Sequence, residues 1–278
     1  MTGHVGSERL AFGIAVLGGP TIVVDIAGLR IVVDPTFDPP GDKGYLTKLS
    51  GPAVTAAELG PVDVVLVSHD LHPDNLDDSG REFALAAPLL VTGPRSAGRL
   101  GQAATPLAVW ETASVARGDG PGDLTIRAVP AMHGPVDGVR DADGHVNCEV
   151  TGFVLAADGV PTVYVSGDNA SVGVVAEVGR RVGPIEVAVL FVGAARVPTK
   201  ERGRPLTLTG ERAAAAAAVL GSSVVVPAHC DGWAHFSEGL GRVVEAFDEA
   251  GLSDVLRTAD PGSWAINRPI AETSWPWA

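Results

Sequence analysis

Several predicted strands of this chain end directly before a histidine or an aspartate, and this pattern limits the available folds more than any other feature. The strands are predicted from short apolar runs at 62–67, 124–129, 162–165 and 224–226. The polar residues that follow these runs are His69, His133, Asp168 and His229. Loops at one edge of a sheet scaffold commonly carry binding and catalytic groups. We therefore expect these side chains to come together at one edge of a sheet.

The rest of the chain is predicted to mix short strands with helices. Further strands are expected at 10–17, 21–26, 30–33, 88–92, 149–156 and 187–191. One helix is expected at 209–220, because Thr209 can cap its N-terminus and Gly221 can end it. Other helices are expected to begin near 96–100 and to cover 240–251. No linker, low-complexity tail or short repeat interrupts the sequence, so we expect a single domain over residues 1–278.

Composition indicates a folded protein and argues against two classes of partner. Hydrophobic residues make up 46% and charged residues 19%, which is enough apolar material for a large core. The formal net charge of −13 argues against nucleic acid or an anionic membrane as partner, because basic surfaces supply the affinity for both. A small anionic substrate stays open, since a bound metal can dominate the local charge. A homo-oligomer is also left open.

The cysteine count and the apolar runs favour a cytoplasmic location. Cys148 and Cys230 are too few for a disulfide framework, so a reducing compartment is expected. Residues 1–9 are polar and lack a basic segment and a cleavage site, so we expect no signal peptide. No uninterrupted apolar run is long enough to predict a membrane span.

The densest group of candidate ligands lies at 68–77, with the sequence Ser-His-Asp-Leu-His-Pro-Asp-Asn-Leu-Asp. His69, His72 and Asp74 offer imidazoles and a carboxylate directly after a predicted buried strand. Zinc binds both donor types at about 2.0–2.2 Å, and a tight loop lets several ligands converge. A polar, solvated turn is the alternative interpretation, because Asp, Asn and Pro are common turn residues.

The later strand ends supply the remaining candidate ligands. Taken singly, His133 and His229 could be structural histidines, and Asp168 could cap a helix. If they lie at one edge, they explain one another as ligands of a shared site. The predicted metal site comprises His69, His72, Asp74, His133, Asp168 and His229. The cofactor is predicted to be zinc, one or two ions per chain, ahead of manganese or iron.

The order of these motifs resembles the metallo-β-lactamase-fold hydrolases, in the branch similar to ascorbate-6-phosphate lactonase. The matching motifs are Gly-Gly-Pro-Thr at 18–21, Asp-Pro-Thr-Phe at 34–37, the 68–77 loop, His133, Ser-Gly-Asp at 166–168 and Pro-x-His at 227–229. The resemblance implies an α+β fold, an αββα four-layer sandwich with two mixed sheets flanked by helices. It also implies metals at one edge between two similar halves, with Asp168 bridging two ions.

The loop at 68–77 departs from the family pattern in two places. The family has one residue between its leading histidines, whereas two residues separate His69 from His72 here. Either His69 still reaches the metal, or Asp70 takes that position. Asn75 stands where the family has a further histidine, and we expect it not to bind metal, because an amide competes poorly with imidazole for zinc. One-metal and two-metal sites therefore both stay open.

These donors predict a hydrolase that attacks its substrate with a metal-bound hydroxide, because zinc lowers the pKa of bound water to about 7. The expected substrate is a small lactone, ester or phosphoester. Asp74 is predicted to bind metal or to orient the attacking water, and His235 to donate a proton to the leaving group. Trp233 is predicted to line the substrate pocket, with ordinary packing as its alternative. The basic segment 196–204 is either an anion site or a solvated loop.

Two other classes of function compete with this prediction. A metal-binding protein of the same fold without hydrolytic activity is suggested by Asn75 and by the altered loop spacing. A redox protein would need two iron ions and a further domain for electron supply, and no flavin motif or second domain is visible in the sequence. We therefore rank the redox alternative lowest.

Overall fold

The first of two large sheets is built mainly from the N-terminal half of the chain. The computed structural model describes residues 3–268. Its first sheet has the order β15-β1-β2-β3-β6-β7-β8, antiparallel from β15 to β3 and parallel from β3 to β8. The strands are β1 (Phe12–Gly18), β2 (Thr21–Ile26), β3 (Leu29–Val33), β6 (Val64–Val67), β7 (Leu89–Thr92), β8 (Ala104–Pro106) and β15 (Trp264–Arg268).

The second sheet comes from the later half and has the order β14-β13-β12-β11-β10-β9. It is parallel from β14 to β12 and antiparallel from β12 to β9, so it repeats the mixed pattern of the first sheet. Its strands are β9 (Thr112–Ala116), β10 (Asp123–Pro130), β11 (Thr151–Ala156), β12 (Val163–Val165), β13 (Val187–Phe191) and β14 (Val224–Ala228). A small separate ladder joins β4 (Gly41–Asp42) to β5 (Thr47–Lys48).

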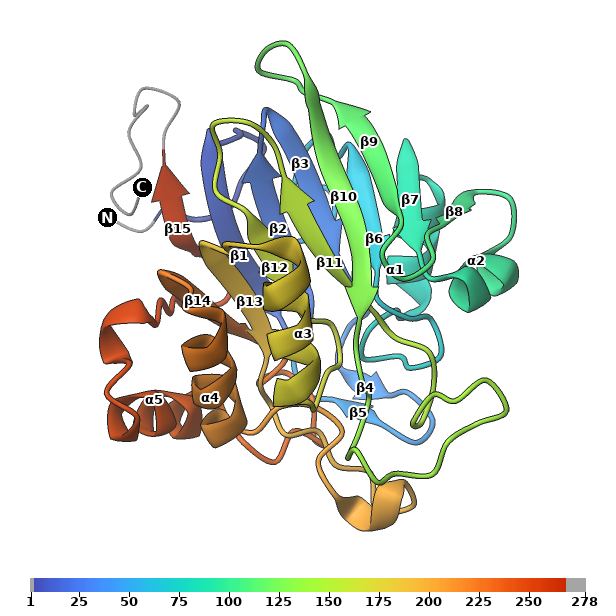
Figure 1. Cartoon of the computed structure of the whole chain (residues 1–278). Coiled ribbons are helices and arrows are strands. Elements are labelled where there is room, and N and C mark those ends of the chain that lie inside the picture. The colour runs from blue at the N-terminus through green and yellow to red at the C-terminus, as the bar shows by residue number, and fades with distance from the viewer. Residues whose placement is uncertain (1–2, 269–278) are drawn as a thin grey trace.

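The two sheets pack face to face, and helices cover both outer faces (Figure 1). Apolar side chains from both sheets, such as Ile31 and Phe153, share one central core. On the outer face of the first sheet lie α1 (Asp78–Leu85) and α2 (Pro94–Leu100). On the outer face of the second sheet lie α3 (Val172–Val182), α4 (Gly210–Leu220) and α5 (Leu240–Glu249). Short 3₁₀ turns occur at Glu201–Gly203 and Ser253–Val255. The predicted αββα four-layer sandwich is confirmed.

Most predicted elements are present within a few residues of their expected bounds. The helix α4 begins after Thr209, whose side chain accepts a hydrogen bond from the Arg212 amide, and Gly221 ends it in the left-handed conformation with φ 64°. No local pattern predicted α1, α3, β4, β5, β8, β9 or β15. Glycines inside α1 and α3, such as Gly80 and Gly173, weaken the local helical signal, and burial stabilises these helices instead.

The expectation of one domain over residues 1–278 stays a prediction, although the core described above is shared by both sheets. Among the described residues, no helix has both the length and the apolar character that crossing a bilayer requires.

Candidate metal centre

The predicted ligands follow strands whose ends meet at one edge of the sandwich. In the first sheet, β6 leads into Ser68 and His69. In the second sheet, β10, β12 and β14 lead toward His133, Asp168 and His229. Parallel strands carry their carboxyl ends to the same side, so β12 and β14 deliver their ligands together. The edge lies beside β4 and β5 (Figure 1).

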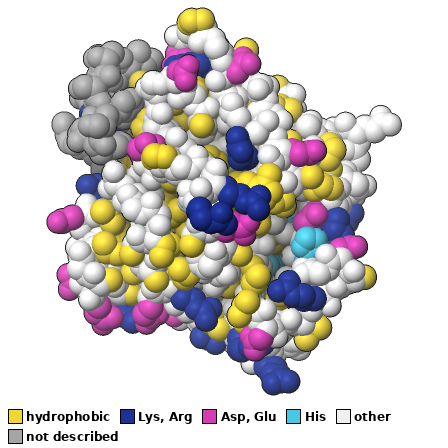
Figure 2. Space-filling model, viewed as in Figure 1, with side chains coloured by type: hydrophobic (Ala, Val, Ile, Leu, Met, Phe, Trp, Pro, Cys, Tyr) yellow, Lys and Arg dark blue, Asp and Glu magenta, His cyan; other side chains and the backbone are white. Residues whose placement is uncertain are grey.

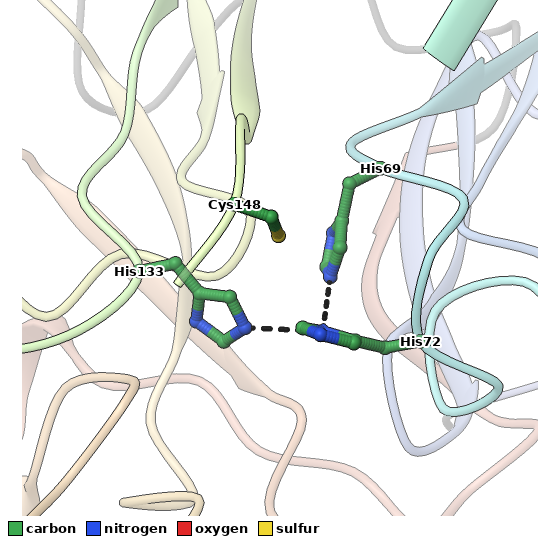
Figure 3. Close-up of side chains that lie close together, drawn as sticks. All are labelled: His69, His72, His133 and Cys148. Atoms are coloured by element: carbon green, nitrogen blue, oxygen red, sulfur yellow. Dashed lines mark hydrogen bonds between the residues drawn. The ribbon is translucent and has the colours of Figure 1, made fainter. Parts of the chain in front are cut away.

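Three of the histidines converge on one another and form the histidine cluster. The His69 Nε2 atom lies 2.8 Å from His72 Nδ1, and the His133 Nε2 atom lies 3.2 Å from the same His72 nitrogen. The sulfur of Cys148 points toward these rings (Figure 3). One ligand atom from each of the four residues lies within 4.8 Å of the others. Atoms about 2.0–2.3 Å from a single zinc ion must lie this close together.

Hydrogen bonds at the Nδ1 atoms of His69 and His133 determine which of their ring nitrogens carry lone pairs. The Ser68 hydroxyl donates to Asp34 at 2.7 Å, so it can accept the Nδ1 hydrogen of His69 at 3.0 Å. His133 donates its Nδ1 hydrogen to the Leu206 carbonyl at 3.0 Å. The Nε2 atoms of His69 and His133 therefore both present lone pairs to His72 Nδ1. A single nitrogen hydrogen cannot satisfy both, whereas a cation between the rings can.

Burial keeps these imidazoles neutral. Desolvation, followed by repulsion from neighbouring histidines, holds the pKa of His69 well below its usual range. The pKa of His133 is lowered in the same way, and burial lowers the pKa of His72 to about 4. Neutral imidazole is the form that binds metal. Burial also raises the pKa of the Cys148 thiol to about 12, so this group is protonated in the metal-free protein.

A second group, the carboxylate cluster, combines Asp74, Asp168 and His229. The His229 Nε2 atom lies 3.2 Å from Asp168 Oδ1 and 3.3 Å from Asp74 Oδ2. Both ring nitrogens of His229 are buried and make no hydrogen bond. The other oxygen of Asp168, Oδ2, lies 3.5 Å from His133 Nε2 and so connects the two clusters. Buried imidazole nitrogens that make no hydrogen bond and lie close to two carboxylates fit a second metal position beside the first.

The carboxylate cluster has strongly shifted ionisation. Burial, followed by the charge of Asp74, raises the pKa of Asp168 to about 6. Burial opposes ionisation of Asp74 as well, but His229 and His235 outweigh it and hold its pKa well below its usual range. Burial lowers the pKa of His229, yet the carboxylates of Asp168 and Asp74 raise it further, and the net direction is upward. Without metal, the cluster therefore favours a protonated His229 beside an ionised Asp74.

His229 is held in an unusual backbone conformation. Its φ of 60° lies in the left-handed region, which residues other than glycine seldom occupy. Its amide donates to the Gly19 carbonyl at 2.7 Å, and its ring stacks on Phe191. A Cβ atom on Gly193 would lie 2.0 Å from the His229 carbonyl oxygen, so only glycine fits there. This packing aims the ring at the carboxylates.

Asp70 and His69 point in different directions. Asp70 receives hydrogen bonds from the Arg99 guanidinium at 2.9 and 3.0 Å and lies 3.7 Å from Arg81. His69 is fully buried in the histidine cluster. Of the two alternatives for the first ligand, the geometry therefore favours His69.

Asn75 joins two buried carboxyl groups. Its side-chain nitrogen donates to Asp168 at 3.1 Å and to Asp34 at 3.2 Å, while its buried Oδ1 has no hydrogen-bond partner. Burial raises the pKa of Asp34 to about 7. The amide thus acts as a hydrogen-bond donor in the position where the resembling family has an imidazole.

Asp77 fixes the far end of the 68–77 loop. It caps α1 by accepting from the Gly80 amide at 2.8 Å, and it pairs with Lys48 at 2.9 Å. It also accepts the amide hydrogens of Phe37 and Asp38. The last acidic residue of the ligand-rich loop is therefore a structural anchor, and it lies outside both clusters.

A cleft beside the clusters is lined by Tyr45, His72, Asp74, Lys200 and His235, among others. The His235 Nε2 atom lies 3.0 Å from Asp74 Oδ2. Histidine occupies only a small patch on the face shown in Figure 2, and the histidines of the two clusters are buried.

Trp233, predicted to line the substrate pocket, is instead only 2% exposed, and its ring lies 5.5 Å from Lys48 Nζ. Its indole also packs against Gly19. It is not among the described residues that line the cleft. This placement favours the packing alternative.

Tyr45, Lys200 and Cys148 are site residues that the sequence did not predict individually. Lys200 belongs to the basic segment, but nothing local marks it as the member that reaches the cleft. A signal for Cys148 does exist. Two neighbouring predicted strands, now β10 and β11, pair antiparallel, with Pro130 opposite Thr151. Residues just after β10 and just before β11 therefore lie opposite each other, which brings Cys148 near His133.

Comparison with known proteins agrees with this fold. Residues 29–230 match the family model described as a beta-lactamase superfamily domain. No curated protein sequence matched the chain. Many solved structures resemble it, among them the following three. Isothiocyanate hydrolase from Delia radicum gut bacteria is 21% identical with a TM-score of 0.75, and the match covers 92% of this chain and 99% of that one.

The other two structures differ in described activity. Igni18, a metallo hydrolase from the archaeon Ignicoccus hospitalis, is 22% identical with a TM-score of 0.68, over 91% of this chain and 97% of that one. CmlA, a diiron β-hydroxylase from Streptomyces venezuelae, is 16% identical with a TM-score of 0.57, over 78% of this chain and 44% of that one. At these identities the likeness establishes the shared fold.

Proposed function

The chain belongs to the beta-lactamase superfamily, and from this premise we propose that it hydrolyses a small lactone, ester or phosphoester in a metal-dependent reaction. The observation that carries the proposal is the placement of the two clusters. Asp168 lies between them, 3.5 Å from His133 and 3.2 Å from His229. Both clusters border the same cleft, the histidine cluster through His72 and His133 and the carboxylate cluster through Asp74 and Asp168, so a substrate there would lie beside both.

Zinc is the proposed metal, because neutral imidazoles and carboxylates are its common ligands. The histidine cluster would hold one ion and the carboxylate cluster a second, with Asp168 shared. A bound zinc ion would activate water and polarise a carbonyl or phosphoryl oxygen. The lactonase-like branch, a cytoplasmic location and a homo-oligomeric state remain parts of the same proposal. The unpaired state of Cys148 and Cys230 is in keeping with a reducing compartment.

The protein's own groups would position the substrate and move its protons. His235 borders the cleft, and the hydrogen bond between its Nε2 atom and Asp74 orients the ring. His235 is the proposed donor to the leaving group, and Asp74 is the residue that would hold it in place. Lys200 donates to Asn147 at 2.8 Å at the cleft wall, where its charge would attract an anionic substrate.

The test is turnover by metal-loaded protein. The metal-free chain is reconstituted with zinc, manganese or iron and assayed on lactones, carboxylic esters, phosphomonoesters and phosphodiesters. An isothiocyanate is added, because a structural neighbour is described as acting on one. We expect metal-dependent hydrolysis of at least one class, and a lower kcat with retained metal in His235→Gln. If metal binds fully but no class turns over, the non-hydrolytic alternative replaces the proposal.

A further inference from the structure

Cys148 lies among the metal-binding histidines although nothing in the ligand motifs calls for a cysteine there. Its sulfur and one nitrogen each of His69, His72 and His133 lie within 4.8 Å of one another. Figure 3 shows the sulfur directed at the space that the three rings surround. Only 6% of Cys148 is exposed. A thiol this close to three imidazole nitrogens stands where a fourth ligand would stand.

The loop that carries Cys148 is held in place by its own contacts. The Cys148 amide donates to the Val146 carbonyl at 2.8 Å. Asn147 has a φ of 63°, and its side-chain oxygen accepts from Lys200. On the other side, Glu149 accepts the Arg95 amide hydrogen at 2.9 Å. These contacts hold the loop so that the sulfur faces the histidine cluster.

Ordinary packing explains the position less well. A free cysteine often behaves as a small hydrophobic residue in a core. Cys148 is not a member of the apolar clusters that the described residues form on either side of the two sheets or between them. The polar imidazoles that surround it would gain little from an apolar neighbour, whereas thiolate and imidazole together are a common ligand set for zinc.

We propose that Cys148 is the fourth protein ligand of the metal in the histidine cluster. It would bind as a thiolate and release its thiol proton to solvent. The inference rests on the metal binding of the proposed function. Four protein ligands close a zinc site, whereas three leave a position for water or substrate. The carboxylate cluster, with only Asp74, Asp168 and His229, would then be the position that meets the substrate.

Cobalt substitution tests the proposal without relying on activity. Metal-free parent protein, Cys148→Ser, Cys148→Ala and the control Cys230→Ser are loaded with Co²⁺, and their near-ultraviolet spectra are recorded. We expect a thiolate-to-cobalt charge-transfer band in the parent and in Cys230→Ser and no such band in the Cys148 variants. Metal affinity of the Cys148 variants should fall by at least about tenfold, since even indirect contacts to a metal matter by that much.

X-ray absorption of the zinc-loaded parent gives a second readout that needs no variant. A sulfur neighbour at about 2.3 Å from zinc is the expected result. A parent that binds cobalt through nitrogen and oxygen alone, with no charge-transfer band and no sulfur neighbour, would overturn the cysteine assignment and leave the proposed function standing. Persistence of the band in Cys148→Ser would also overturn it. A parent that binds no cobalt or zinc would overturn both proposals.

Discussion

At the scale of single residues, Asn75 shows how the site differs from the pattern it resembles. Its amide donates to two buried carboxyl groups, Asp34 and Asp168, that would otherwise face each other without a donor between them. A histidine there could bind metal, but a neutral ring could donate only one hydrogen. Asn75 therefore donates two hydrogen bonds at a position where a histidine would bind metal. The carboxylate cluster is left with three ligand groups.

The choice between His69 and Asp70 is decided by a pair of substitutions. We expect His69→Ala to lower zinc affinity by at least about tenfold, because it removes an imidazole from the histidine cluster. Asp70→Asn should retain zinc affinity, because Asp70 contacts Arg99 and Arg81 instead. Competition with a chromophoric chelator measures both affinities. Loss of zinc in Asp70→Asn with retention in His69→Ala would reverse the assignment.

The buried carboxyl group of Asp34 should make the free energy of unfolding depend on pH. Its pKa rises from 3.8 to about 7 on folding, so between these values the folded protein holds a proton that the unfolded chain has lost. The free energy of unfolding contributed by Asp34 therefore falls as the pH rises through this range, by up to about 4 kcal/mol. Asn at this position cannot titrate and tolerates the left-handed φ of 45°.

Urea unfolding of metal-free parent and Asp34→Asn between about pH 4 and pH 7 checks this expectation. The parent should lose stability relative to the variant as the pH rises. The difference in unfolding free energy between the two proteins reports on Asp34 alone, because the buried histidines titrate in both. A difference that does not change with pH would contradict the prediction.

At the scale of elements, α4 shows how composition and packing combine. Its alanine run favours a helix, and its buried positions include Ala213 and Ala216, while Ala215 faces solvent. Small side chains let α4 lie close to its neighbours in the cluster that also contains Val175 of α3 and Phe247 of α5. High helix propensity favours the helix, and its small side chains determine how closely it can pack against α3 and α5.

Two leucine substitutions in α4 separate propensity from packing. Ala216→Leu should cost about 1–3 kcal/mol of stability, because Ala216 is fully buried and the larger side chain overpacks the layer. Ala215→Leu should change stability by no more than about 0.5 kcal/mol, since leucine is also a good helix former and position 215 is exposed. Thermal or urea unfolding measures both. Equal costs would mean that α4 does not pack as described.

At the scale of the whole molecule, the metal centre lies where the two halves meet. His69, His72 and Asp74 follow strand β6 of the first sheet, and His133, Asp168 and His229 follow strands of the second. Ligands from both sheets would make a bound metal a cross-link between the layers. Metal that binds only the folded state also stabilises it by mass action.

Chelation should therefore lower the melting temperature of the parent protein. The same chelator should have a smaller effect on Asp168→Ala and His229→Ala, because each removes a ligand group from the carboxylate cluster. His4→Ala, with an exposed side chain remote from the clusters, should respond like the parent. Melting followed by circular dichroism, with and without chelator, gives the comparison. Unchanged chelator effects in both variants would mean that the carboxylate cluster holds no metal that contributes to stability.

The amino-acid sequence by itself determined the strand ends and the residues placed there. Short apolar runs closed by polar residues are local features. They predicted β13 at its observed bounds, and they predicted the ligand-bearing strands β6, β10, β12 and β14 to within a few residues. The same local order predicted that His69, His133, Asp168 and His229 share one edge. The helix α4 could be predicted because its cap and stop signals are local as well.

Only the tertiary structure decided which of these neighbours face one another. Adjacent residues such as His69 and Asp70 carry the same local signal, yet the turn after β6 sends one into the core and the other to Arg99. Cys148 reaches the histidines because β10 and β11 pair, and Trp233 is buried because it packs against Gly19 in the turn between β1 and β2. These contacts join residues distant in sequence. They depend on sheet pairing and on the packing of layers, which no local pattern of residues specifies.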